Sequence, residues 1–284
     1  MGMVFGAKEQ FSDSFWQALQ ATGVLHVIAA SGMNVTFVAA ALLFSLGLFL
    51  PRRVALVFGS LGIIFYIFLV GFQPSILRAS IMGLLAFGAS LLGKQNFAAI
   101  AVFVSSYLLL LWQPSYLFDV GFQLSFLATL GIVFVKPLID CWFSRVGKFA
   151  EFGGETVSTT LAAQLGTIPI LFGRFGQVGL LSLLVNALVL WIIPVVMIIG
   201  SVAAIMDLVF PFGGQLQVYL SLPFLLFFEI VVSFFGGQGW VMTIGTWHWT
   251  FSLGYYLLLT AMVLFLKPEQ KALSLEESLR LEKF

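Results

Sequence analysis

Residues 26–50 read HVIAASGMNVTFVAAALLFSLGLFL, and this run contains no Asp, Glu, Lys or Arg. A helix needs about 20 consecutive apolar residues to cross the hydrocarbon core of a membrane. The run is long enough, so it predicts a membrane-spanning helix. His26, Ser31 and Asn34 place polar side chains at its beginning. Such side chains are costly in lipid, and they usually face a partner helix or water.

The whole chain has the composition of an integral membrane protein. Its 284 residues are 61% hydrophobic and only 9% charged, whereas soluble domains carry about a quarter charged residues. The net charge of +1 excludes a strongly basic surface as the main source of affinity for nucleic acid. The single cysteine, Cys141, excludes an internal disulfide framework and any metal site built from several cysteines.

Apolar runs recur along the chain and predict an all-α integral membrane protein, a polytopic helical bundle of about eight to nine spans. The predicted spans cover residues 27–49, 54–72, 76–93, 97–112, 120–139, 157–173, 179–206, 215–235 and 251–266. The runs 97–112 and 157–173 are short for a full crossing, so each is a candidate re-entrant or tilted segment. Together the runs predict one transmembrane domain, residues 25–266.

The two flanking segments, residues 1–24 and 267–284, differ from this domain. In the first, Phe15, Trp16 and Leu19 recur at helical spacing among polar residues, which predicts an amphipathic helix at the membrane interface. This segment lacks the apolar core of a signal peptide. The second is charged and has a helical pattern, so we expect a solvated cytoplasmic helix.

Positive charge is distributed unevenly over the predicted loops. With the N-terminus outside and all the predicted spans crossing, ten of the thirteen Lys and Arg residues fall on the inner side. Cytoplasmic loops of membrane proteins carry an excess of Lys and Arg. This pattern therefore predicts an orientation with the N-terminus outside and the C-terminus inside.

Polar side chains within the predicted spans gather mostly in their outer halves. We expect these residues to line a vestibule or passage: His26, Ser31, Asn34, Ser75, Arg78, Asp119, Gln123, Gln164 and Asn186. For Ser31, Asn34 and the lone amides, hydrogen bonds between neighbouring helices are the alternative.

Arg78 and Asp119 are predicted to form an ion pair. Arg78 lies in the first turn of its helix, where the helix dipole disfavours a cation, so it needs an anionic partner. Asp119 has the opposite sign and the same predicted depth. Asp119 also precedes an apolar run, and a role as N-cap would account for it alone. With His26 and His248 as the only histidines, no His-rich metal motif is present.

Four blocks of the sequence resemble one known family. They read TGVLHVIAASGMNV (22–35), GFQPSILRASIMGLLAFGASLLGK (71–94), QPSYLFDVGFQLSFLATLGI (113–132) and TLAAQLGTIPILFGRFGQVGLLSLLVNAL (160–188). In order and spacing they are similar to the transmembrane competence domain of the ComEC family of DNA-internalisation channels. The resemblance covers roughly residues 4 to 265. The family pattern often has His where this chain has Asn34, which weakens a proton or metal role at that position.

The resemblance implies a multi-pass channel in the bacterial inner (cytoplasmic) membrane that carries one DNA strand inward during natural transformation. Its implied partners are single-stranded DNA, the lipid bilayer, and the DNA-receptor, nuclease and ATP-driven motor proteins of the uptake machinery. Apart from the resemblance, small residues at Ala79 and Gly83 and at Ala89 and Gly93 predict close packing of the helix over 76–93, either within one chain or across a homodimer. We expect no cofactor and no enzymatic activity. We also expect this chain to lack the outer OB-like domain and the nuclease domain that family members often add.

Two other functions compete with the channel. A small-solute transporter would use the Gly- and Pro-interrupted segments near 71–75 and 166–169, although the two halves of the sequence do not match. An intramembrane hydrolase would use Ser31 as nucleophile and His26 as base. A spacing of five residues places those two side chains about 140° apart on a regular helix, which is too far for a direct hydrogen bond.

Overall fold

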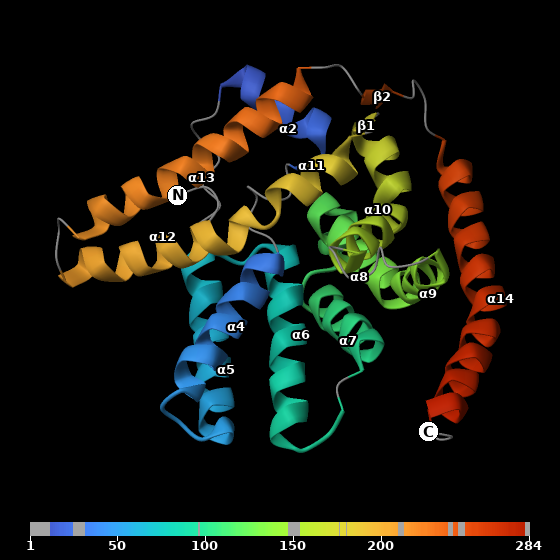
Figure 1. The fold of residues 1–284 in the computed structure, drawn as a ribbon, viewed down its shortest axis with the longest axis horizontal. Coiled ribbons are helices and arrows are strands. Elements are labelled where there is room, and N and C mark those ends of the chain that lie inside the picture. Colours follow the sequence, from blue (N-terminus) through green and yellow to red (C-terminus); the bar gives the residue numbers. More distant parts are fainter. Residues whose placement is uncertain are drawn as a thin grey trace. The chain divides into compact units, whose positions relative to one another are not determined.

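The computed structural model describes residues 12–24, 32–95, 97–146, 154–175, 177–179, 181–209, 213–237, 241–243 and 248–281. Most of them are helical (Figure 1). The elements up to the middle of the chain are α2 (Asp13–Thr22), α4 (Gly32–Gly47), α5 (Arg52–Val70), α6 (Pro74–Leu91), α7 (Ala98–Trp112), the 3-10 helix η1 (Pro114–Phe118) and α8 (Val120–Phe134). The later elements are α9 (Lys136–Val146), α10 (Gly154–Phe175), β1 (Gln177–Gly179), α11 (Ser182–Val189), α12 (Ile192–Val209), α13 (Gly213–Gly236), β2 (Val241–Thr243) and α14 (Trp249–Leu281).

The chain divides into two compact units. The first comprises Met1–Ser125 and Val178–Met242, and the second comprises Phe126–Gln177 and Thr243–Phe284. The predicted transmembrane domain, residues 25–266, contributes to both. The strands β1 and β2 pair as a short two-stranded ribbon, an element that the hydropathy pattern does not predict.

In the first unit, α4, α5 and α6 pack against one another as successive antiparallel helices (Figure 1). Gly71, with a φ of 100°, ends α5 and lets the chain reverse direction before Pro74 opens α6. Apolar side chains from all three helices form a buried core: Val35, Ala39, Leu56, Ile63, Tyr66, Ile76 and Phe87. α7 packs on α6, and a smaller core of Leu77, Leu109 and Phe122 joins α6, α7 and α8.

A helix is present in the predicted N-terminal segment, namely α2. The Ser12 hydroxyl accepts a hydrogen bond from the Phe15 N–H at 3.3 Å and caps its start, and Gly23, with a φ of 70°, caps its end. Leu19 is fully buried in a core formed with α11, α12 and α13. The apolar face of α2 therefore packs on protein, and its place at the membrane interface stays a prediction.

The second unit contains a close crossing of α8 and α10. A Cβ added at Gly131 of α8 would overlap the Ala162 carbonyl oxygen, and one added at Gly166 of α10 would overlap the Leu127 carbonyl oxygen. Glycine at both positions lets the two backbones approach this closely. In the same unit, α9, α10 and α14 pack on one another.

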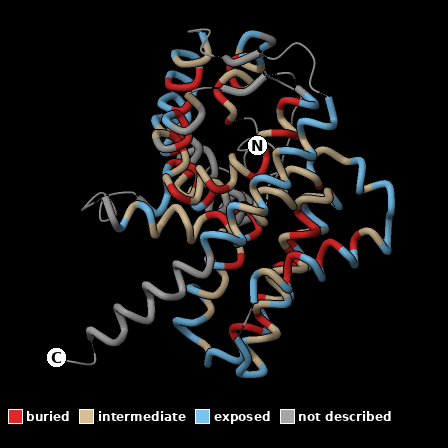
Figure 2. Tube along the Cα trace, turned by 90° about the vertical axis from the view of Figure 1, so that its right-hand side faces the viewer, coloured by how far each residue is buried: buried red, intermediate tan, exposed pale blue. Residues whose placement is uncertain are grey.

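Figure 2 shows exposed residues along many of the helices. Many of these exposed residues are large and apolar, as expected for surfaces in contact with lipid. Among the described residues, five helical stretches are long and apolar enough to cross a membrane, namely Arg52–Val70, Pro74–Leu91, Val120–Ser144, Tyr219–Gly236 and Trp249–Leu266. Two shorter apolar helices are α4 and α7. The predicted all-α membrane architecture is confirmed. The number of spans, about eight to nine by length, stays a prediction, as does a re-entrant path for 97–112 or 157–173.

The prediction of a single helix over 179–206 is wrong. The structure has two helices there, α11 and α12, separated at Leu190 and Trp191. Pro194 accounts for the break, because it has no N–H to donate to the Leu190 carbonyl and its ring would clash with that group. Pro194 instead lies in the first turn of α12, where the missing N–H is not needed. At the other end of the chain, the predicted span 251–266 and most of the tail 267–284 form one helix, α14.

Candidate functional site

Arg78 is a buried cation in α6, only 5% exposed. Its Nε–H donates to the Ser125 Oγ of α8 at 3.0 Å, and its Nη2 donates to the same oxygen. Its Nη1 contacts the Met82 sulfur, one turn further along α6, at 3.2 Å. All these partners are neutral. The guanidinium stays protonated and presents N–H groups in a planar fork that suits carboxylate and phosphate oxygens.

Asp119 does not neutralise Arg78, and the predicted ion pair between them is wrong for the part of the chain that the structure describes. The Asp119 Oδ1 accepts a hydrogen bond from the Phe122 N–H at 2.7 Å, so the carboxylate caps α8. The partner of Arg78, Ser125, lies six residues further along α8, about 9 Å in axial rise. Arg78 therefore meets α8 at the level of Ser125. The prediction had placed Arg78 at the level of Asp119, nearer the start of α8.

Ser125 was not among the predicted site residues, although it is the partner of Arg78. Ser125 follows Phe122 by three residues and so lies on the same face of α8. Phe122 packs with Leu77 of α6 in the small core, so this face of α8 is turned to α6. That spacing in the stretch LFDVGFQLSF was the available signal.

Gln123 joins η1 to α8 and carries a free acceptor. Its Nε2 donates to the Leu117 carbonyl oxygen at 2.8 Å. Its Oε1 is buried and has no hydrogen-bond partner within the described residues. A buried acceptor left unpaired is destabilising by about 1–3 kcal/mol, so this oxygen is available to a polar group that enters beside the start of α8.

The helices α4, α5 and α6 hold polar side chains within their shared core. Asn34 is fully buried, and the Tyr66 hydroxyl interacts with its side chain without reaching hydrogen-bond geometry. Ser80 is also fully buried, and its hydroxyl has no partner among the residues described. These groups occupy the interior of the three-helix group, where interhelical hydrogen bonding is the ordinary use of such residues.

The start of α4 lies against the first turns of α6. A Cβ added at Gly32 would lie 3.0 Å from the Ala79 Cβ and 3.6 Å from the Ser75 carbonyl oxygen. The half-buried Ser75 and the buried Arg78 belong to these same turns. The structure thus brings the beginning of α4 to the end of α6 that carries Arg78.

The other predicted site residues lie elsewhere or outside the described residues. Asn186 of α11 is 3% exposed, and its Oδ1 is buried without a partner in the described part of the chain. It stands between Val185 and Val189 of the core that also holds α2. Gln164 lies in α10 of the second unit. His26 and Ser31 fall outside the described residues, so their roles, like the pore-lining role of the whole set, stay predictions.

The two ends of the helix group α4–α7 differ in charge. The exposed Arg52 and Arg53 open α5, and the exposed Lys94 follows α6. Because successive helices alternate in direction, these three cations share one end (Figure 1). Arg78 and Asp119 lie toward the opposite end. A cytoplasmic excess of Lys and Arg makes the end with Arg78 the predicted outer end.

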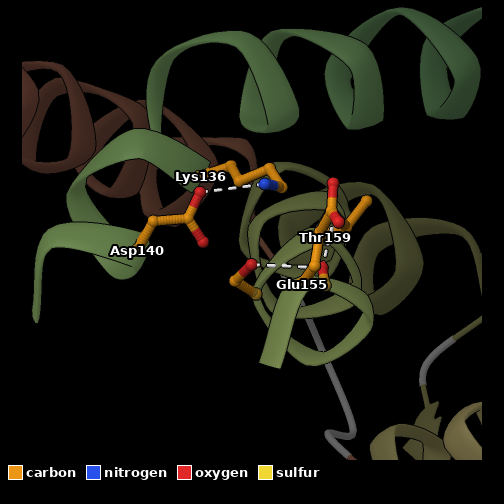
Figure 3. A network of polar contacts seen from close by, with 5 residues as sticks. Lys136, Asp140, Glu155 and Thr159 are labelled. Atoms are coloured by element: carbon orange, nitrogen blue, oxygen red, sulfur yellow. Dashed lines mark hydrogen bonds and ion pairs between the residues drawn. The ribbon is translucent and has the colours of Figure 1, made fainter. Parts of the chain in front are cut away.

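Polar contacts of the second unit at α9 and α10 are local (Figure 3). Lys136 and Asp140 form an ion pair of 2.9 Å one helical turn apart on α9. On α10, the hydroxyls of Ser158 and Thr159 donate to the Glu155 carbonyl oxygen at 3.1 and 2.7 Å. Each contact stays within its own helix. Among the described residues, no group of His, Cys, Asp and Glu side chains is placed to hold a metal ion.

The fold and this site define a multi-pass helical membrane protein. One of its candidate spans carries a buried arginine that pairs with no acidic side chain among the described residues. The chain belongs to the competence protein family, whose model matches residues 3–269, and the predicted family is confirmed. The chain is 29% identical to the ComE operon protein 3 of Bacillus subtilis (strain 168) over 81% of its own length. It is 24% identical to the uncharacterized protein YcaI of Escherichia coli (strain K12) over 91% of its length. An uncharacterized protein of Aquifex aeolicus (strain VF5) is 31% identical over 58% of the chain.

The chain spans only part of these relatives. It covers 28% of the Bacillus subtilis protein, 35% of the Escherichia coli protein and 37% of the Aquifex aeolicus protein. No solved structure matches the chain.

Proposed function

We propose that this chain forms the membrane passage through which one strand of DNA enters a bacterial cell during natural transformation. Membership of the competence protein family over residues 3–269 supports this proposal. So does the likeness to a protein named for the ComE operon. On this proposal the chain is a channel and not an enzyme, and it lies in the cytoplasmic membrane.

The observation that carries the proposal is the buried arginine with neutral partners. Isolated charges in membrane spans are costly and usually mark the path of an ion or a substrate. Arg78 contacts only the Ser125 hydroxyl and the Met82 sulfur among the described residues, so its positive charge is not cancelled locally. Phosphate oxygens are strong, often bidentate partners for guanidinium groups. A single such group favours a weak contact, which a conduit needs because each phosphate must also leave.

The proposed passage works with other proteins. A strand carries one charge per nucleotide and must be driven through. We therefore propose a DNA receptor on the outer side, a nuclease that supplies the single strand, and an ATP-driven motor as partners, with a homodimer as the candidate assembly.

The test is entry of a fluorescent single-stranded oligonucleotide into liposomes that contain the full chain. We expect Arg78→Ala to lower the initial rate about ten-fold, the value of one lost charged contact, and Arg78→Lys to lower it less. Arg53→Ala is the matched control, because Arg53 is an exposed arginine at the opposite end of the helix group. An equal loss in Arg53→Ala would mean that Arg78 acts only through net charge.

The same liposomes separate the competing functions. A passage for DNA should admit the oligonucleotide, whereas a small-solute transporter should admit only small solutes and exclude the strand. A channel should tolerate Ser31→Ala and keep most of its DNA entry, whereas a hydrolase with Ser31 as nucleophile would lose nearly all its activity. Entry of small dyes without any entry of the oligonucleotide would contradict the proposed passage.

A further inference from the structure

Helix α10 contains Pro169 in its interior, and this proline removes one hydrogen bond from the helix. In a regular α-helix the N–H of residue 169 would donate to the carbonyl of Leu165, four residues earlier. Proline has no N–H, so the Leu165 carbonyl loses its donor within the helix, and the helix is weakened at that turn. In a membrane, such a carbonyl must find a donor on a neighbouring helix.

Helix α14 supplies that donor. The Tyr255 hydroxyl donates to the Leu165 carbonyl oxygen at 2.8 Å. The next residue, Tyr256, donates to the next carbonyl, that of Gly166, at 3.1 Å. The two tyrosine rings stack edge to face with centroids 5.7 Å apart, which holds both hydroxyls in position. All these residues belong to the second unit.

The same turn of α10 is also fixed by α8. Gly166 lies against the Leu127 carbonyl at the close crossing of α8 and α10. The backbone at residues 165 and 166 is therefore held by α14 through hydrogen bonds and by α8 through the crossing. Gln164, one of the predicted passage residues, immediately precedes this turn.

We propose that the Pro169 turn is a hinge in α10, and that Tyr255 is a positioning residue that holds the hinge in one conformation. Tyr255 replaces the donor that Pro169 lacks. When this bond opens, the part of α10 before the hinge, with Gln164, moves relative to the part after it. The effect on Gln164 rests on the proposed passage. The hinge itself does not depend on DNA.

The two tyrosines should contribute unequally. Without Tyr255, the Leu165 carbonyl lacks a regular helical donor, because residue 169 is proline. Without Tyr256, the Gly166 carbonyl still faces the N–H of Ile170, its regular helical partner. Tyr256→Phe is therefore a matched control that removes the same hydroxyl one position away.

The experiment measures a distance across the hinge by pulsed electron paramagnetic resonance in the full chain in nanodiscs. Cys141→Ser removes the native thiol, and spin labels are attached at the exposed positions by Thr156→Cys and Arg174→Cys. A straight helix would separate these two sites by about 27 Å. We expect Tyr255→Phe to broaden the distance distribution and Tyr256→Phe to leave it nearly unchanged.

The same measurement in a Pro169→Ala background tests whether the role of Tyr255 depends on the proline. Alanine restores the N–H that reaches the Leu165 carbonyl, so Tyr255→Phe should no longer broaden the distribution when combined with Pro169→Ala. Hydrogen exchange over residues 165–175 should agree, with amides about ten-fold faster in Tyr255→Phe than in the native chain and no such change in the Pro169→Ala background.

An unchanged distribution in Tyr255→Phe would overturn the hinge, and equal broadening in both backgrounds would overturn the specific role of Tyr255. If Tyr255→Phe alone does not fold, recovery of folding by Pro169→Ala supports the proposal, and continued failure contradicts it. Because none of these measurements uses DNA, they are independent of the proposed passage. If the oligonucleotide does not enter liposomes that contain the native chain while the hinge measurements give the expected results, that failure would count against the passage alone.

Discussion

At the scale of single residues, the site depends on which polar group reaches Arg78. The sequence supplied an acid of the right sign, Asp119, but that carboxylate caps α8 through the Phe122 N–H. Ser125 accepts two hydrogen bonds from the guanidinium instead. Such choices depend on the depth at which two helices meet, which neither sequence segment specifies.

Replacement of Asp119 should act through the helix cap. We expect Asp119→Ala to lower the free energy of unfolding by about 0.5–2 kcal/mol, since the Phe122 N–H loses its acceptor. Asp119→Asn should preserve most of it, because the amide oxygen can still accept. Thermal unfolding in detergent measures both. A loss as large in Asp119→Asn as in Asp119→Ala would show that the charge matters and would revive an ion pair.

Replacement of Ser125 should leave a buried cation with fewer partners. We expect Ser125→Ala to destabilise the protein by about 1–3 kcal/mol, because it removes an acceptor shared by two guanidinium nitrogens. Ser45→Ala is the control, since Ser45 is exposed on α4 and donates only to its own helix, at Ala41 and Leu42. Equal stability of the two variants in chemical unfolding would contradict the contact between Arg78 and Ser125.

At the scale of helices, glycine and proline decide where backbones approach and where they break. Gly131 and Gly166 permit the crossing of α8 and α10, and Pro194 separates α11 from α12. The hydropathy pattern found the apolar runs but joined α11 and α12, because a run of apolar residues continues through the break. Hydropathy does not register the effect of Pro194 on the preceding turn, where the proline ring excludes a continuous helix.

The crossing can be tested with one methyl group. Gly166→Ala would place a Cβ onto the Leu127 carbonyl, and such overpacking is typically destabilising by about 1–3 kcal/mol. Gly88→Ala is the control, because Gly88 is also inside a helix and a Cβ there meets nothing within 4 Å. It should be neutral or stabilise by up to about 1 kcal/mol. Unfolding free energies that change equally in both variants would argue against a close crossing.

At the scale of the whole molecule, the charge pattern and the alternating helices assign an orientation in the membrane. Lys94, after α6, and Gln113, after α7, are both exposed and lie at opposite ends of the α6–α7 pair. The cations at one end predict that this end faces the cytoplasm.

Cysteine labelling in spheroplasts checks this orientation. In a Cys141→Ser background, Gln113→Cys should react with a membrane-impermeant maleimide. Lys94→Cys should react only after the membrane is permeabilised. The reverse pattern would invert the molecule and place Arg78 toward the cytoplasm. If both sites reacted from outside, α7 would not cross the membrane and would instead be a re-entrant segment.

Composition and patterning alone determined that this chain is a helical membrane protein and which family it resembles. They also determined roughly where its helices lie and which polar residues within them are unfavourable in lipid. These properties depend on local hydrophobicity and spacing along one helix. Only the tertiary structure decided that Ser125 accompanies Arg78, that Asp119 is a cap, and that Tyr255 supplies the donor missing at Pro169. Those partnerships join residues distant in sequence, and they depend on the depth and rotation of packed helices. The apolar pattern of each helix leaves both of these undetermined, because in lipid it can be satisfied at many rotations.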